Sequence, residues 1–150
     1  MSRVSFAAVL VGAITDIVAS AVVGIPFGIY VVSSRGLSGL PKAQLKTALT
    51  AAIHASTGLY TTEILIGLVC SVCGGYVAAR LAKHDEVLNG LLASWLCVAI
   101  GLYSLATGRT SEPVPIHLLT IATTPLCYLL GAYLRLTAVR ARSTAITTTA

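Results

Sequence analysis

The sequence contains few charged residues. Lysine, arginine, aspartate and glutamate make up 10% of its 150 residues, against about 25% in a typical soluble domain. Hydrophobic residues instead make up 56%, which leaves too little polar surface to cover a water-soluble globule. This composition excludes a soluble globular domain, a disordered chain and a small disulfide-stabilised secreted domain. It predicts a protein that resides in a lipid bilayer.

The sequence also lacks the short motifs typical of enzymes. It contains no Walker loop, no GxSxG or HExxH motif and no dinucleotide-binding fingerprint. Its three histidines, His54, His84 and His117, have no spacing that indicates a haem or zinc site. The net charge of +5 is spread over the ends of apolar segments, whereas a nucleic-acid site needs a clustered basic face. We therefore expect no enzymatic activity, no cofactor, no metal and no nucleic-acid partner.

Long uncharged segments predict four transmembrane helices, because about 20 helical residues cross a hydrocarbon core ~30 Å thick. Residues 87–108 and 113–134 carry no formal charge, so each fits one crossing. Glu63 and Arg80 bound a third apolar segment and are expected at its two headgroup layers. The predicted fold is an all-α, membrane-embedded four-helix transmembrane bundle over residues 1–142, followed by a flexible tail at 143–150. Its helices cover about residues 4–32, 59–82, 87–107 and 113–136.

The first predicted helix is long enough to tilt, or to bend at Pro26. It is not expected to be a cleaved signal peptide, because Asp16 interrupts the apolar centre that a signal peptide needs. The connection to the second helix is the longest in the chain, and apolar residues recur at helical spacing within residues 41–55. This pattern indicates an interfacial helix, which acts either as a lid or docking element or as a simple tether.

The distribution of basic residues predicts the orientation. An even number of crossings places both termini on one side of the membrane. That side carries Arg3, Arg80, Lys83, Arg135, Arg140 and Arg142, and the other side carries Arg35, Lys42, Lys46 and Arg109. The positive-inside rule then favours cytoplasmic termini in this multi-pass protein; the membrane itself, the cell inner (plasma) membrane, is implied by the resemblance described below.

Small residues recur at every fourth position of the first two predicted helices. In the first helix the row consists of Ala8, Gly12, Asp16, Ser20, Gly24 and Gly28. In the second helix it consists of Gly67, Ser71, Gly75 and Ala79. Such rows allow two helix backbones to approach closely in a bilayer, where burying leucine gives little driving force. We therefore predict that these two helices form a tightly packed pair.

Two acidic residues are candidates for proton or cation coupling. Asp16 lies near the middle of its helix, where an ionised acid costs from ~2.5 to more than 10 kcal/mol depending on the estimate. It is expected to face the bundle, either protonated or hydrogen-bonded to Ser, Thr or Cys. The alternative is a neutral acid that holds helices together. Glu63 is the second candidate, although a helix N-terminus in the headgroup region also favours an acid for structural reasons.

The four cysteines offer a third type of site. Cys70 and Cys73 have the CxxC spacing of a redox pair, as in membrane thiol oxidoreductases, and four thiols can also bind a metal. Such an oxidoreductase needs further cysteines in an extramembrane loop, and this sequence has none. We therefore expect Cys70, Cys73, Cys97 and Cys127 to be small apolar fillers of the core.

Four short elements resemble a widespread family of small, uncharacterised bacterial membrane proteins with four helices. They are TDI at residues 15–17, GGYVAARLA at 74–82, NG at 89–90 and LGAYLR at 130–135. The second, a GGYxAAR-like element, is the distinctive one. The resemblance covers most of the chain except the first connection and the tail. It implies a four-helix fold in a bacterial plasma membrane and implies no activity.

Three functions remain as hypotheses. The first is a non-enzymatic structural or partner-binding subunit, whose partners are membrane lipids and either a second copy of the chain or another membrane protein. The second is a small dimeric proton-coupled transporter that uses Asp16, similar in size to the small multidrug-resistance transporters. The third is a membrane thiol oxidoreductase that uses Cys70 and Cys73.

Overall fold

The computed structural model contains helices and turns, and no strand, over the residues that it describes: 4–82, 84–108, 110 and 113–148, with side chains up to Ala141 apart from Arg140. Its elements are α1 (Phe6–Ser34), the short 3-10 helix η1 (Leu37–Gly39), α2 (Lys42–His54), α3 (Thr57–Leu81), α4 (Glu86–Ala106) and α5 (Val114–Thr148). The helices α1, α3 and α4 and the Val114–Val139 part of α5 are long and apolar enough to cross a membrane. The prediction of an all-α bundle with four potential membrane spans is therefore confirmed.

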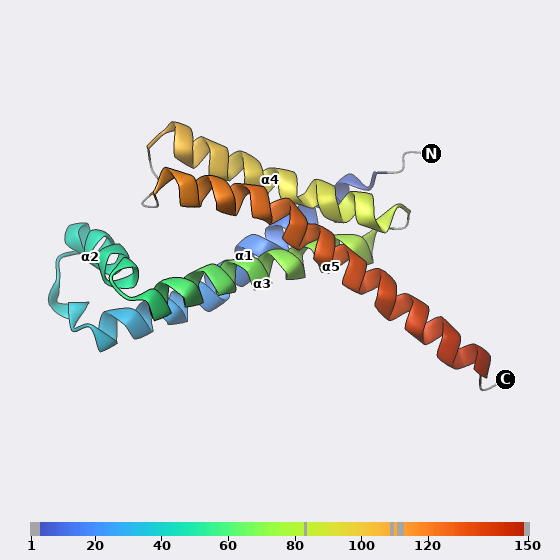
Figure 1. Ribbon diagram of the computed structural model, residues 1–150, viewed down its shortest axis with the longest axis horizontal. Coiled ribbons are helices and arrows are strands. Elements are labelled where there is room, and N and C mark those ends of the chain that lie inside the picture. Colours follow the sequence, from blue (N-terminus) through green and yellow to red (C-terminus); the bar gives the residue numbers. More distant parts are fainter. Residues whose placement is uncertain (1–3, 83, 109, 111–112, 149–150) are drawn as a thin grey trace.

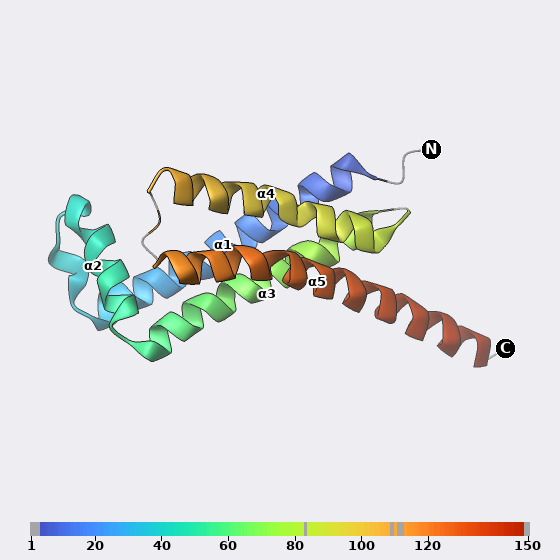
Figure 2. The same cartoon turned by 45° about the horizontal axis from the view of Figure 1, so that its top comes forward.

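The four long helices form two pairs that cross near their middles. Helix α1 runs beside α3, and α4 runs beside α5 (Figure 1). The start of α1, the end of α5 and the turn between α3 and α4 lie at one end of the bundle, and α2 lies at the other. After a turn of the view, the first half of α1 is seen reaching the first half of α4 (Figure 2). Toward the α2 end the two pairs separate.

The closest packing lies in the half of the bundle nearer to the chain termini. A Cβ added to Gly12 of α1 would lie 2.5 Å from the Ala78 Cβ of α3, and one added to Gly75 of α3 would lie 2.6 Å from the Tyr128 Cα of α5. Gly90 of α4 and Gly131 of α5 lie in equally close contacts, and Ala79 is fully buried. Because lipid is as apolar as leucine, this backbone approach is what holds the helices together.

The small-residue rows do not pair along their full length. An added Cβ at Gly24 or at Gly67 would have no atom within 4 Å, and one at Gly28 would meet only Leu49 of α2, at 3.9 Å. In a helix with 3.6 residues per turn, a step of four residues overshoots a full turn by about 40°. A row of such steps therefore winds around the helix, and two rows can meet only near the point where the helices cross.

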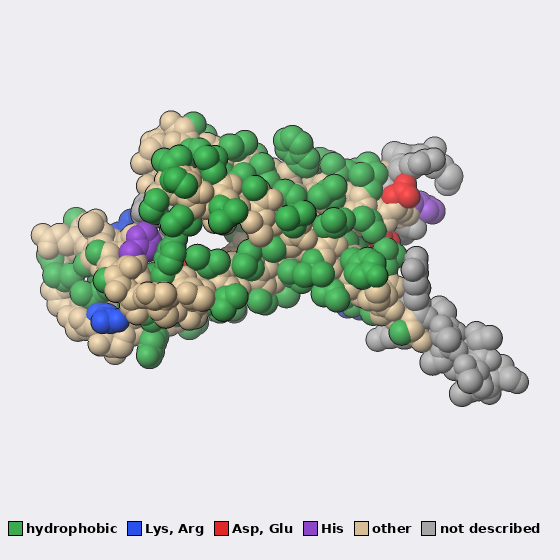
Figure 3. All heavy atoms as spheres, viewed as in Figure 1, with side chains coloured by type: hydrophobic (Ala, Val, Ile, Leu, Met, Phe, Trp, Pro, Cys, Tyr) green, Lys and Arg blue, Asp and Glu red, His purple; other side chains and the backbone are tan. Residues whose placement is uncertain are grey.

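The outer surface of the bundle is apolar. Large hydrophobic side chains cover the face seen in Figure 3, and Trp95 on α4 is 66% exposed. A soluble monomer does not expose contiguous apolar surface of this extent, whereas a bilayer solvates it.

Helix α5 is longer than the sequence predicts. Helix α5 continues to Thr148, past the predicted end at residue 136 and into the segment expected to be a flexible tail. The apolar stretch ends near Arg135, but the residues that follow include no glycine or proline, so nothing in the backbone stops the helix.

Helix α2 falls within residues 41–55, where an interfacial helix is expected. Its buried residue is Ile53, and Leu45 and Leu49 line a shallow groove against α1.

Candidate functional site

Asp16 lies at the point where all four long helices meet, and its side chain is 5% exposed. Its Oδ2 atom accepts hydrogen bonds from the Ser71 hydroxyl of α3 at 3.0 Å and from the Tyr128 hydroxyl of α5 at 2.9 Å. The Cys97 thiol of α4 donates to the same oxygen at 3.5 Å. The expectation that Asp16 faces the bundle and bonds to serine and cysteine is therefore confirmed.

The two carboxyl oxygens of Asp16 are held unequally. Oδ2 accepts three hydrogen bonds from three other helices, whereas Oδ1 accepts a longer hydrogen bond, at 3.4 Å, from the Ser20 hydroxyl on the same helix. A proton on Oδ2 would force a donor to turn away, and a buried donor without a partner is costly. Oδ1 is therefore the oxygen that can take up a proton with the least disturbance.

Gly74 makes room for this cluster. A Cβ added there would lie 3.0 Å from the Asp16 Cβ, 3.1 Å from the Tyr128 Cζ and 2.9 Å from the Gly12 carbonyl oxygen. A larger residue at this position would push α3 away from both the acid and the tyrosine ring. The glycine pair at 74 and 75 thus serves two contacts, since Gly74 faces the Asp16 cluster and Gly75 faces the α5 backbone.

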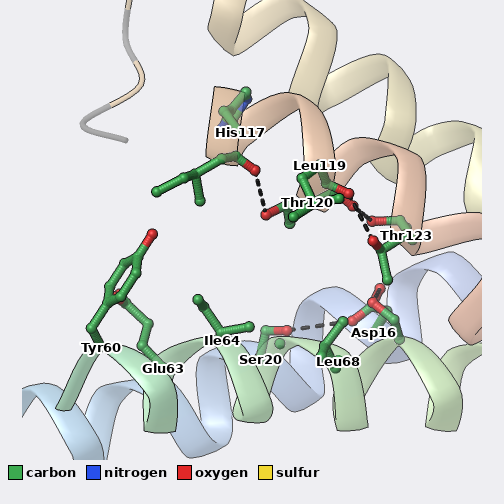
Figure 4. A pocket seen from close by; sticks show the side chains of 14 residues that line it. Asp16, Ser20, Tyr60, Glu63, Ile64, Leu68, His117, Leu119, Thr120 and Thr123 are labelled. Carbon is green, nitrogen blue, oxygen red and sulfur yellow. Dashed lines mark hydrogen bonds between the residues drawn. The ribbon is translucent and has the colours of Figure 1, made fainter. Parts of the chain in front are cut away.

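A cavity of about 470 Å³ reaches Asp16 from the α2 end of the bundle. It lies between α1, α3 and α5, where the helix pairs separate, and the molecule is hollowed there in Figure 3. Tyr60 and Glu63 from the first turns of α3 and His117 from the first turn of α5 line its outer part. Asp16 and Ser20 line its inner part (Figure 4), as does Ser71, whose hydroxyl bonds to Asp16. The acid therefore lies at the base of a cavity that begins near the helix ends.

The wall contributed by α5 carries a row of threonines. The hydroxyl of Thr120 donates to the Ile116 carbonyl at 3.0 Å, that of Thr123 to the Leu119 carbonyl at 2.8 Å, and that of Thr124 to the Thr120 carbonyl at 2.9 Å. The apolar side chains Ile64, Leu68, Ile116 and Leu119 complete the wall. The cavity is therefore apolar over much of its surface, with oxygen atoms set among the hydrocarbon.

The two acids predicted from sequence line this same cavity at different depths. Asp16 is buried at its base, and Glu63 is exposed near its outer end. The other predicted packing residues divide: Ser20, Ser71 and Gly67 line the cavity, whereas Gly12, Gly75 and Ala79 belong to the closely packed half.

The cysteines do not behave as one group. All four are free, with Cys70 buried and Cys73 exposed. Cys97 is more than a filler, because its sulfur lies 3.3 Å from the Tyr128 hydroxyl and bonds to Asp16. Among the described residues, no group of three or more His, Cys, Asp and Glu side chains could hold a metal ion.

Sequence analysis missed Tyr128 and the position of His117. Tyr128 is fully buried and completes the Asp16 cluster. Its position was a usable signal, because tyrosine is typical of membrane interfaces and a buried phenol needs a hydrogen-bond partner. His117 gave no such signal, since its role depends on how α5 faces α3.

Comparisons with known proteins add no family to this description. No family model, no curated protein and no solved structure matches the chain. The residues of the cavity and of the Asp16 cluster are therefore what bears on function.

Proposed function

We propose that this protein is a small, non-enzymatic, proton-coupled transporter in which Asp16 is the coupling site. The observation that carries the proposal is the cavity that leads from one end of the bundle to this buried acid. An ionisable residue inside a membrane is expensive to maintain and typically marks a substrate or proton pathway.

The two halves of the bundle differ in the way that a carrier requires. On the terminal side of Asp16, the contacts at Gly12 and Gly75 bring the helix backbones close together. On the α2 side, Gly67 faces the open space of the cavity. A site that is open to one side and closed to the other is one state of an alternating-access cycle, in which one part of a bundle rocks against another around a fixed site.

The chemistry at Asp16 supports proton exchange. Three donors bond to Asp16 Oδ2, while Oδ1 accepts the hydrogen bond from Ser20. Asp16 and Ser20 both line the cavity. A solute or a proton can therefore compete for Oδ1 while the hydrogen bonds that join the four helices stay in place. The other titratable groups in contact with Asp16 are the Cys97 thiol and the Tyr128 hydroxyl.

We also infer the direction of the cavity. The basic residues favour cytoplasmic termini, and the resemblance of the four short elements implies a bacterial plasma membrane. With that orientation, the α2 end and the cavity face the outside of the cell, and the closely packed half faces the cytoplasm.

A structural or partner-binding role is the second candidate. The open space beside Gly24 on α1 favours it, since small residues allow a second copy of the chain or another membrane protein to approach closely. We rank it below transport because such a role gives no reason for a cavity that ends at an acid. The thiol oxidoreductase stays a prediction that rests on the Cys70 and Cys73 spacing.

Proton movement in reconstituted vesicles tests the proposal. Vesicles that contain the protein and a trapped pH-sensitive dye are given an acidic interior, and panels of small cationic, neutral and anionic solutes are added outside. We expect at least one solute to release protons through the wild-type protein and not through Asp16→Asn. Asparagine keeps an oxygen acceptor for the surrounding donors. The fold of the Asp16→Asn variant is checked by size-exclusion chromatography and thermal unfolding.

The matched control is Asp85→Asn, which removes an acid from the α3–α4 turn, outside the cavity. It should behave like the wild type. If no solute class moves protons, or if Asp16→Asn is as active as the wild type, the proposal is wrong.

A further inference from the structure

We propose that the cavity binds a small organic cation with a hydrogen-bond-donating ammonium head and an apolar body. This inference rests on the cavity of the proposed function and names the class of its ligand. The reason is that most hydrogen-bond donors of the cavity wall already donate to other groups of the protein.

Five of the six hydroxyl groups of the wall, leaving aside that of Tyr60, have spent their hydrogens inside the protein. Those of Thr120, Thr123 and Thr124 donate to carbonyl groups of their own helix, and those of Ser20 and Ser71 donate to Asp16. A hydroxyl group has one donor hydrogen and two acceptor lone pairs. What these five side chains offer to a ligand is therefore oxygen lone pairs, which accept hydrogen bonds.

His117 adds no donor to the cavity. Its Nε2 lies 3.1 Å from the Gly101 carbonyl oxygen, and its Nδ1 lies 3.2 Å from the Thr110 hydroxyl. Because a carbonyl group only accepts, Nε2 carries the hydrogen and donates it there. Both ring nitrogens are thereby engaged with protein groups.

The formal charges of the wall have one sign. The described residues that line the cavity include the acids Asp16 and Glu63 and include no lysine or arginine. An anion would therefore meet acceptors and two acidic side chains in the lining, which like-charge repulsion and desolvation make costly. An ammonium group, with several donors and a positive charge, complements both features.

The size and apolar surface of the cavity point to an organic cation instead of a metal ion. About 470 Å³ falls within the range of roughly 300–1,000 Å³ typical of small-molecule pockets. Ile64, Leu68, Ile116 and Leu119 supply the apolar contact that a bare or hydrated alkali ion does not use. The Tyr60 ring near the outer end can in addition attract a cation over its face.

Equilibrium binding to the detergent-solubilised full chain tests this inference with three ligands of matched body and different head group. They are 2-phenylethylammonium, 2-phenylethanol and 3-phenylpropionate, and the binding of each is measured by equilibrium dialysis. In a fourth experiment, sodium chloride is tested for its ability to displace the bound ammonium compound. We expect saturable binding of the ammonium compound, weaker binding of the alcohol, and no binding of the carboxylate. Sodium ions should fail to displace it beyond an ionic-strength effect that potassium chloride reproduces.

Two variants locate the binding. Asp16→Asn should weaken ammonium binding by roughly ten- to a hundredfold, as expected for the loss of a charge-assisted hydrogen bond. Gly67→Leu places a side chain into the open space of the cavity and should abolish binding without lowering thermal stability. Asp85→Asn should bind as the wild type does. If Asp16→Asn does not fold, Gly67→Leu still decides the location.

The inference is overturned if the carboxylate or the alcohol binds as tightly as the ammonium compound, if sodium displaces it specifically, or if Gly67→Leu binds normally. Failure of the transporter proposal gives a different pattern. Ammonium binding that depends on Asp16 without solute-driven proton release in vesicles would support the ligand class and refute coupled transport. Proton release driven by anions alone would support coupled transport and refute the proposed ligand class.

Discussion

The contact between Gly75 and Tyr128 offers a quantitative test of how the bundle is held together. In Gly75→Ala, the new Cβ would lie 2.6 Å from the Tyr128 Cα and 2.7 Å from its carbonyl carbon, and closer still to its carbonyl oxygen. Carbon atoms in contact are normally about 3.5–4.0 Å apart. Helix α5 must therefore move by roughly 1 Å, because the obstructing atoms belong to the backbone and cannot rotate away.

That movement has a cost and a consequence. Overpacking of this kind destabilises a folded protein by about 1–3 kcal/mol. For a chain of this length, each kcal/mol corresponds to about 2–4 °C in the melting temperature, so we expect a decrease of roughly 2–12 °C. The same displacement would lengthen the 2.9 Å hydrogen bond from Tyr128 to Asp16, so ligand binding at the acid should weaken as well.

Gly67→Ala is the matched control, since it makes the same change on the same helix. An added Cβ at Gly67 meets nothing within 4 Å, and alanine favours a helix over glycine by about 0.5–1 kcal/mol. Its melting temperature should equal or exceed that of the wild type. Both variants are measured by thermal unfolding in detergent, followed by circular dichroism and by the loss of the folded species on size-exclusion chromatography. If Gly75→Ala is as stable as Gly67→Ala, α3 and α5 do not approach at Gly75 and the packing argument fails.

Three further outcomes are expected. Trp95 is the single tryptophan of the chain and is 66% exposed on α4, so brominated lipid should quench its fluorescence and aqueous iodide should not; the opposite result would place this face in water. Tyr128→Phe removes the phenol hydrogen bond to Asp16 and should destabilise the protein by about 0.6 kcal/mol, the average measured for hydrogen bonds between membrane helices, and by no more than about 1.7 kcal/mol, the largest value. An unchanged melting temperature would be the contrary finding. Asn89 is fully buried, accepts a hydrogen bond from the Ser5 backbone N–H at 2.7 Å and donates to the His84 and Asp85 carbonyl oxygens. Asn89→Ala should therefore lower the free energy of unfolding by about 1–3 kcal/mol and speed hydrogen exchange of the Ser5 amide. Unchanged exchange at Ser5 would show that Asn89 does not anchor the start of α1.

The local properties of the chain were predictable because they depend on residues that are neighbours in sequence. The length of an apolar segment decides whether a helix can span a bilayer, and the cost of a charge at its centre decides that Asp16 turns inward. For the same reason a helix was expected at residues 41–55. The end of α5 was misplaced because the end of an apolar stretch is where a helix leaves the lipid, which does not require the helix itself to end.

Serine and cysteine were predictable as types of partner for Asp16, whereas tyrosine was not, and none of the three partners was predictable by its position. Ser71 is 55 positions away in the sequence, Cys97 is 81 and Tyr128 is 112. Which of the serines, cysteines and tyrosines reaches the acid depends on the rotation of three separate helices about their own axes. Sequence periodicity defines the faces of each helix, but it does not say which face meets which neighbour.

The sequence by itself determined that this protein has four helices long and apolar enough to cross a membrane, that small residues are available for close packing, and that one acid lies near the middle of such a helix. Only the tertiary structure decided where the glycines touch and where they face open space, because two helices that cross at an angle can be in contact along one part of their length only. That crossing packs the helices closely on one side of Asp16 and leaves a cavity on the other, and it brings Glu63 and His117 from different helices to the same cavity wall.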